Sequence, residues 1–137
     1  MIQLAQVNLD HVLTELTVIF AQYEAALMDN DLETLDHLFW TSTLTVRFGV
    51  AENLYGIDAI RAFRQARNVG SLKRVLSHTQ IITYGEDFAT TTTEFTRSDQ
   101  MLGRQSQTWV RFNEGWRVVS AHISLNQHGA VAAIHCD

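Results

Sequence analysis

Arg47 is the residue of this sequence best placed to bind an anion. It follows Thr43 and Thr45 on one face of a predicted strand, and three apolar residues alternate with them on the other face. An arginine enclosed by a fold is costly unless a carboxylate or another anion meets it, and its planar fork of donors matches a carboxylate. The alternatives are a surface arginine and one that pairs with Glu52.

Tyr23 is the second candidate catalytic residue beside Arg47. It lies on the apolar face of the first predicted helix, four residues after Ile19. A buried phenol usually finds a hydrogen-bond partner, and this hydroxyl could donate to a developing oxyanion. The alternative is a core tyrosine bonded to a backbone carbonyl.

A polar face follows the predicted strand 103–112, where alternation groups Gln105, Gln107 and Trp109. Two amides and an indole N–H on an inner face would suit a planar polar ligand. The register of the following hairpin decides which faces pair, and loops of two or three residues at 113–115 give opposite answers. The alternative for the glutamine pair is a sheet-to-sheet dimer interface.

Five other polar residues are candidates for binding a ligand. Glu52 and Asn53 lie in a predicted connection, where binding groups are often found, although Asn53 also suits a local backbone turn. His122 and His78 are candidates for acid–base chemistry because imidazole is the side chain best suited to it near neutral pH, although a strand histidine is more often structural. We also consider Glu94 as an inward carboxylate, against a solvated edge residue.

No nucleophile motif is present. The sequence has no G-x-S-x-G, and Cys136 lies next to the C-terminal residue. His128, His135 and Cys136 do not have the spacing of a zinc site. We therefore expect neither a metal nor a cofactor.

The composition predicts one globular domain at 1–126 with a tail at 127–137. With 46% hydrophobic and 18% charged residues, the chain is not of the disordered class. Its net charge of -5 and scattered basic residues argue against nucleic-acid binding. One cysteine, no signal-peptide pattern and no apolar run of ~20 residues indicate a cytoplasmic protein that does not bind membranes.

Periodicity predicts two helices, a strand, a third helix and then four consecutive strands. Asn8 or Asp10 could cap the first helix, Asp31 could cap the second, and Gly70 would end the third, which would bury Ala62 and Phe63 among other residues. The predicted helices are 10–28, 31–40 and 57–67, and the predicted strands are 43–48, 74–84, 88–97, 103–112 and 116–125. This order indicates an α+β layer architecture.

The element order and the closing segment 115–124, GWRVVSAHIS, resemble the ketosteroid isomerase-like superfamily, also called SnoaL-like or nuclear transport factor 2-like. The resemblance implies a cone-shaped, curved antiparallel sheet wrapped by three N-terminal helices, a cystatin-like fold. Its concave face and first helix would line a pocket.

The same resemblance implies which strand faces point inward. They would be the faces of Gln105, Gln107 and Trp109, with Val119, Ala121 and Ile123 beside them. The Asp base and the Tyr/Asp oxyanion hole of steroid isomerases have no match here, so we do not expect steroid isomerisation.

A closer likeness covers most of the chain, which resembles the AtzH-like family. The segments that carry it are 38–40, 45–49, 52–57, 60–64, 93–97 and 103–111. Proteins of this family are similar to those encoded beside amidases in cyanuric acid and oxalurate breakdown. The resemblance implies a role with small carboxylated ureas, in a decarboxylating or amide-hydrolysing step.

Two hypotheses follow. In the first, the protein is an enzyme acting on a small carboxylated urea or amide, with Tyr23 and Arg47 catalytic. Its substrate-binding residues would be Glu52, Asn53, Gln105, Gln107, Trp109 and His122. In the second, it is a non-catalytic accessory or assembly subunit of an amidase. In both, we expect a homodimer formed through the sheet.

Overall fold

The computed structural model describes residues 1–67 and 72–126. The predictions for Gly70 and for the tail at 127–137 lie outside these residues. The elements are η1 (Leu4–Gln6), α1 (Asp10–Asp29), α2 (Leu32–Leu38), β1 (Val46–Phe48), β2 (Asn53–Tyr55), α3 (Ile57–Ala66), β3 (Arg74–Tyr84), β4 (Phe88–Arg97), β5 (Leu102–Phe112) and β6 (Gly115–Leu125). Sequence periodicity missed η1 and β2, which are each three residues long.

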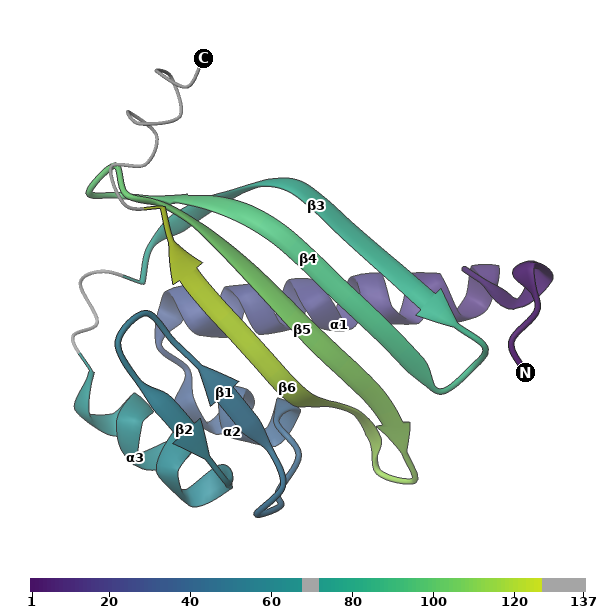
Figure 1. Ribbon diagram of the computed structural model, residues 1–137, viewed down its shortest axis with the longest axis horizontal. Coiled ribbons are helices and arrows are strands. Elements are labelled where there is room, and N and C mark those ends of the chain that lie inside the picture. The colour runs from purple at the N-terminus through teal and green to yellow at the C-terminus, as the bar shows by residue number, and fades with distance from the viewer. Residues whose placement is uncertain (68–71, 127–137) are drawn as a thin grey trace.

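The strands form one six-stranded sheet in the order β2-β1-β6-β5-β4-β3 (Figure 1). The predicted fold class, an α+β fold with a curved sheet wrapped by three helices, is confirmed. The sheet is not wholly antiparallel, because β1 pairs with β6 in parallel. These two strands are far apart in the chain, so no tight hairpin forces them to run in opposite directions.

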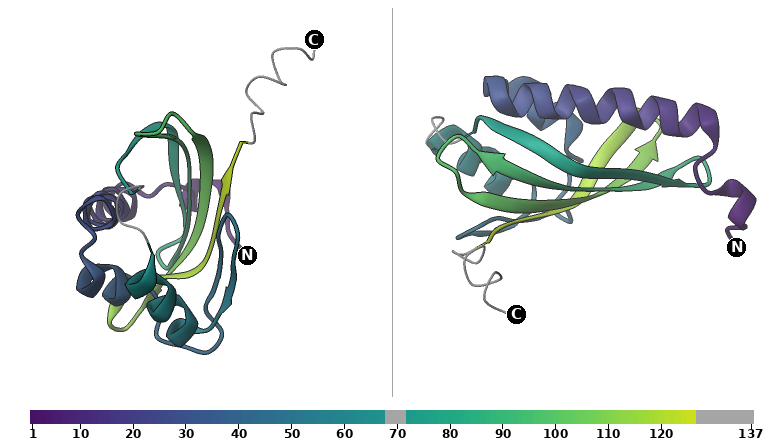
Figure 2. Two further views of the ribbon diagram at one scale, coloured as in Figure 1. Left: turned by 90° about the vertical axis from the view of Figure 1, so that its left-hand side faces the viewer. Right: turned by 90° about the horizontal axis from the view of Figure 1, so that it is seen from above.

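The helices cover one face of the sheet. Figure 2 shows α1 lying across the inner face, with α2 and α3 closing the side next to β1 and β2. Burial alternates along the strands as expected for a sheet with one covered face. In β4 the buried residues are Ala89, Thr91, Thr93 and Phe95, and in β5 they are Gly103, Gln105, Gln107 and Trp109.

A β-bulge in β6 corrects one predicted face. Thr108 pairs with Ser120, whereas the next residue, Trp109, pairs with Val118, so Val119 is an extra residue. The inward side therefore changes along the strand: Val118 is buried before the bulge, and Ala121 and Ile123 are buried after it. Strict alternation could not place Val119, because a bulge inserts one residue without a partner.

The capping residue of α1 was predicted wrongly. Leu9 occupies the N-cap position and makes no side-chain bond. Asn8 is in the left-handed region, and its Oδ1 accepts from the Thr83 backbone N–H at 2.9 Å. Asp31 caps α2 as predicted, because its side chain accepts from Thr34 N at 3.2 Å.

The buried face of α3 differs from the predicted one. Ile57 and Ile60 are buried as predicted, but the third buried residue is Arg64. Ala62 is exposed and Phe63 is half-buried. The helix therefore directs one cation, the guanidinium of Arg64, toward the interior together with its apolar side chains.

Gly103 makes room for the ring of Phe95 on the neighbouring strand. The two residues are cross-strand partners, and a Cβ at Gly103 would lie 2.2 Å from Phe95 Cζ. The buried ring stacks under the guanidinium of Arg74, with Cζ 4.6 Å from the ring centroid. The absence of a side chain at Gly103 thus positions a cation of the inner face.

We expect Gly103→Ala to lower the free energy of unfolding by about 1–3 kcal/mol, the usual range for overpacking. Phe95→Leu combined with it should cost less than the sum of the two single changes, because the shared clash is gone. Urea denaturation measures both, with Ser106→Ala, at an exposed position of β5, as control. Wild-type stability of the Gly103→Ala protein would contradict this packing.

Candidate functional site

A cavity of about 220 Å³ lies inside the fold, lined by residues from α1, β1, α3 and the inner sheet face. The volume is below the usual range for drug-sized ligands and suits a smaller molecule. Its polar lining residues are Tyr23, Arg47, Glu52, Arg67, Arg74, Arg97 and Gln105. Its apolar lining residues are Leu27, Val50, Phe63, Leu72, Phe95, Ile123 and Leu125. Basic groups outnumber acidic ones, so the cavity favours an anion.

Arg47 lies in the cavity wall, and it is also paired. It is 8% exposed, and its Nη1 donates to Glu52 Oε2 at 3.0 Å. A Cβ at Gly49 would lie 1.7 Å from the same Glu52 oxygen, so the glycine allows the carboxylate to reach Arg47. Both alternatives for Arg47, a cavity residue and a partner of Glu52, therefore describe the same side chain.

Arg67 is a cavity cation that the sequence analysis missed. Its Nε and Nη2 are buried, and among the described residues they have no hydrogen-bond partner and no carboxylate that forms an ion pair with them. Burial, and then the charge of Arg47, lower the pKa of Arg67 to about 10, so it remains a cation at neutral pH. Both guanidinium groups lie near the ring of Phe63, whose centroid is 5.1 Å from Arg47 Cζ and 6.0 Å from Arg67 Cζ.

A helical pattern could have revealed Arg67. It lies four residues after Phe63 and seven after Ile60, which places it on the inward stripe of α3. We instead took residue 67 as the end of the helix and gave it no role.

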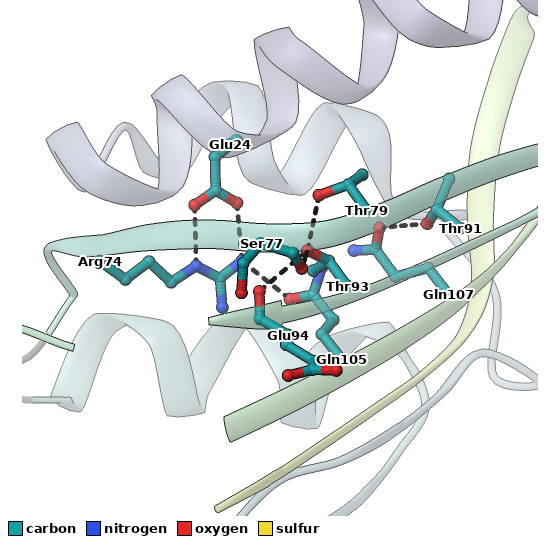
Figure 3. Close-up of polar contacts among 9 residues, drawn as sticks. All are labelled: Glu24, Arg74, Ser77, Thr79, Thr91, Thr93, Glu94, Gln105 and Gln107. Carbon is teal, nitrogen blue, oxygen red and sulfur yellow. Dashed lines mark hydrogen bonds and ion pairs between the residues drawn. The ribbon is translucent and has the colours of Figure 1, made fainter. Parts of the chain in front are cut away.

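Arg74 donates hydrogen bonds to two neighbouring side chains, Glu24 and Gln105 (Figure 3). Its Nε and Nη2 donate to the two carboxylate oxygens of Glu24 on α1, at 2.8 and 2.6 Å. The same Nη2 donates to Gln105 Oε1 at 3.0 Å. Both charged side chains are nearly buried, at 5% and 11% exposure. A buried bidentate pair of this kind fixes geometry, because separating the partners would leave an unpaired charge inside the fold.

Arg97 lies at the cavity rim and pairs with Asp99. Its Nη2 donates to Asp99 Oδ2 at 2.7 Å, and this bond lowers the pKa of the Asp99 carboxyl. Three of the four arginines that line the cavity are therefore paired with a carboxylate. Among the described residues, Arg67 is the exception.

Arg64 lies behind the cavity and supports the position of α3. It is 2% exposed, its Nη1 donates to Asp36 Oδ1 at 2.8 Å, and its Cζ lies 4.2 Å from the Phe39 ring centroid. Burial lowers the pKa of this guanidinium. The pair joins α3 to α2 and explains why α3 tolerates an inward arginine.

Gln107 and Trp109 face inward as predicted, but they do not line the cavity. Trp109 Nε1 donates to Thr91 Oγ1 at 3.1 Å, and Thr91 Oγ1 donates to Gln107 Oε1 at 3.0 Å. This chain lies beneath Tyr23, whose ring meets the indole edge-on at 6.4 Å. Both residues therefore support the wall of the site.

Tyr23 is 3% exposed and lines the cavity. Its hydroxyl makes no hydrogen bond with another described residue, so the carbonyl-bonded alternative is not observed in that part of the chain. The hydroxyl is the O–H donor that the lining offers to a ligand.

Two further predicted binding residues, Asn53 and His122, also lie outside the cavity. Asn53 is exposed in β2, and His122 is exposed on the outer face of β6, against the ring of Phe48. His122 follows the inward Ala121, so alternation after the bulge turns it outward. His78 and Glu94 are also exposed, 3.6 Å apart, and the inward position considered for Glu94 is wrong.

No described helix is both long and apolar enough to span a bilayer.

We expect Tyr23→Phe to change the free energy of unfolding by less than about 0.5 kcal/mol, because the lost hydroxyl makes no hydrogen bond with another described residue. Thr91→Val should cost about 1–3 kcal/mol, because it leaves Trp109 and Gln107 without a partner. Both free energies come from urea denaturation. A Tyr23→Phe loss above about 1 kcal/mol would mean that the hydroxyl is bonded within the protein.

The comparisons with known proteins agree with the fold. A solved structure of a DUF3225 family protein of unknown function from Pectobacterium atrosepticum is 51% identical, with a TM-score of 0.90, covering 93% of this chain and 100% of that one. A cystatin-like fold protein from Burkholderia xenovorans is 43% identical, with a TM-score of 0.84, covering 87% and 95%. A nuclear transport factor 2-like superfamily protein from Salmonella enterica is 25% identical, with a TM-score of 0.69, covering 84% and 91%.

A comparison with curated proteins gave no match. The family model described as AtzH-like matches residues 5–129, which is nearly the whole chain. The resemblance inferred from the sequence is therefore confirmed, including its placement among nuclear transport factor 2-like proteins with a cystatin-like fold. This chain belongs to the AtzH-like family.

Proposed function

We propose that this protein binds a small carboxylate-bearing molecule in its cavity and acts on a carboxylated urea or amide. The observation that supports the proposal best is Arg67, a half-buried cation of the cavity lining whose buried Nε and Nη2 have no hydrogen-bond partner among the described residues. Buried N–H groups without a partner cost free energy, so an anion that accepts from them would relieve a cost already present in the fold. The AtzH-like resemblance points to the same class of ligand.

The free edge of Arg67 has the shape of a carboxylate site. Nε and Nη2 lie on one side of the guanidinium and can donate two parallel bonds to one carboxylate. The small volume of the cavity and the rings of Phe63 and Phe95 favour a planar molecule. Arg47 adds positive charge beside Arg67 but remains bonded to Glu52. Arg67 thus takes over the anion-binding role that the sequence analysis gave to Arg47.

The lining favours loss of CO2 over covalent amide hydrolysis. No Ser, Thr, Cys or His is among the described residues that line the cavity, so those residues offer no aliphatic hydroxyl or thiol to form an acyl-enzyme. Loss of CO2 from a carboxylated nitrogen needs none. The C–N bond breaks, its electron pair stays on nitrogen, and nitrogen takes up a proton. The Tyr23 hydroxyl is the donor we assign to this proton or to the neighbouring carbonyl.

The carboxylate held by Arg67 would be one that stays on the substrate. A guanidinium stabilises a carboxylate more than it stabilises neutral CO2, so it would slow the loss of the group it binds. Arg67 is therefore an anchor, and the reacting nitrogen lies toward Tyr23.

The alternative is a non-catalytic subunit that supports an amidase. The outer face of the sheet, which no described helix covers, is where the expected homodimer contact would lie (Figure 2). In this alternative the cavity need not bind a small anion, and ligand binding therefore separates the two hypotheses.

We expect carboxylated ligands to stabilise the protein against thermal unfolding. A panel of oxalurate, malonate and neutral urea should show stabilisation by the two carboxylates only, by about 2.7 kcal/mol at a hundredfold excess over the dissociation constant. Arg67→Gln should abolish it, whereas Arg104→Gln, a matched change at an exposed position of β5, should not. Stabilisation that survives Arg67→Gln, or no stabilisation at all, would contradict the proposal, and the latter outcome would favour the subunit hypothesis.

Glu52→Gln should tighten oxalurate binding several-fold, because it removes a negative charge beside the cavity while the guanidinium of Arg47 stays. Calorimetric titration at low and high salt should show the gain shrinking as salt increases. Glu94→Gln removes the same charge from the outer face and should change little. Weaker binding by the Glu52→Gln protein would instead give Glu52 a direct role in holding the ligand.

A further inference from the structure

We infer that the Glu24–Arg74 pair acts as a positioning device that aims the side-chain amide of Gln105 at a carbonyl oxygen of the ligand. The inference rests on the proposed function and deepens it. It assigns Arg74 a task different from that of Arg67, although both line the same cavity.

The orientation of the Gln105 amide follows from the chemistry of Arg74. A guanidinium has only donors, so the group that faces it must be the amide oxygen. Arg74 Nη2 donates to Gln105 Oε1 at 3.0 Å, which turns the amide nitrogen away from the guanidinium (Figure 3). Nε2 is buried and has no hydrogen-bond partner in the part of the chain that the structure describes. The result is an oriented N–H donor, without a partner, on a residue that is 2% exposed and lines the cavity.

Arg74 can hold this orientation because its own position is fixed on two sides. Glu24 accepts from Nε and Nη2 at 2.8 and 2.6 Å, and Phe95 supports the guanidinium face at 4.6 Å. The charge of Arg74 is therefore neutralised by Glu24 and is not free for the ligand. Glu24 acts on the ligand through Arg74 and Gln105, and it is a positioning residue.

The uncommitted donors of Gln105 and Arg67 recognise different groups. A neutral amide N–H suits an uncharged carbonyl oxygen, whereas the charged edge of Arg67 suits a carboxylate. A site built around a hydrogen-bond donor rejects analogues that lack the acceptor, because the buried donor is then left unpaired. The ligand class is thus a small carboxylate that also carries a separate carbonyl oxygen, and carboxylates of the same shape without the carbonyl are rejected.

The test compares oxamate and isobutyrate, two carboxylates of similar size with the same branching of their heavy atoms. Isobutyrate replaces the carbonyl oxygen and amide nitrogen of oxamate with two methyl groups and keeps the carboxylate. Calorimetric titration of the full chain gives the two dissociation constants and their ratio. We expect the wild type to bind oxamate at least about tenfold more tightly. Glu24→Gln and Gln105→Met should each reduce the ratio to within about twofold, while isobutyrate binding changes less than about threefold.

Arg67→Gln is the control that separates this inference from the proposed function. It should weaken both ligands in proportion and leave their ratio near the wild-type value, because Gln105 is untouched. Equal binding of both ligands by the wild type, or a full preference retained by Glu24→Gln and Gln105→Met, would overturn the positioning role alone. If the wild type binds neither ligand, the proposed function and this inference are both overturned. Gln105→Met keeps the Glu24–Arg74 pair, so it gives the answer even where Glu24→Gln does not fold.

Discussion

Enclosed guanidinium groups set the main physical constraint on this fold. Arg47, Arg64 and Arg74 lie almost wholly out of water, and each would be strongly destabilising without an anion beside it. The chain supplies these anions from other elements: Glu52 from the β1–β2 connection, Asp36 from α2 and Glu24 from α1. The Arg74–Glu24 pair therefore ties α1 to the sheet, the Arg64–Asp36 pair ties α3 to α2, and the Arg47–Glu52 pair fixes the β1–β2 connection. Arg67, in the same wall, has no such partner among the described residues, and it gives the cavity its preference for an anion.

The backbone of the sheet provides the space in which these charges meet. The bulge at Val119 changes the inward side of β6, so that Trp116 and Val118 fill one half of the inner face and Ala121 and Ile123 the other. Trp116 and Val118 do not line the cavity, whereas Ile123 does. Gly103 contributes in the same way, because its missing side chain lets the Phe95 ring support Arg74. Small local departures from regular strand structure thus determine where the polar groups can gather.

Much of the fold was predictable from sequence, and the reasons are local. Alternation in β4 and β5 and the helical spacing of α1 are strong patterns over ten or more residues. The face of β5, which placed Gln105 inward, came from family likeness, because the hairpin alone allowed two registers. β2 was missed because a three-residue edge strand has too little pattern to detect.

The candidate site was less predictable, because it depends on contacts between distant elements. Sequence could place Arg47 and Tyr23 on inward faces, but it could not show that Glu52 already neutralises Arg47. His122 was proposed as a binding residue from its residue type, whereas the register after the bulge places it on the exposed outer face. Arg67 was missed because the helical stripe of α3 was read for its apolar members only.

The most direct test of the account is a crystal structure of the protein grown with oxalurate. The account predicts the carboxylate within about 3 Å of Arg67 Nε and Nη2, with the Arg47–Glu52 and Arg74–Glu24 pairs intact. A carboxylate bound to Arg47 with Glu52 displaced would contradict the role given to Arg67. An empty cavity at saturating oxalurate would contradict the proposal that this site binds small carboxylates at all.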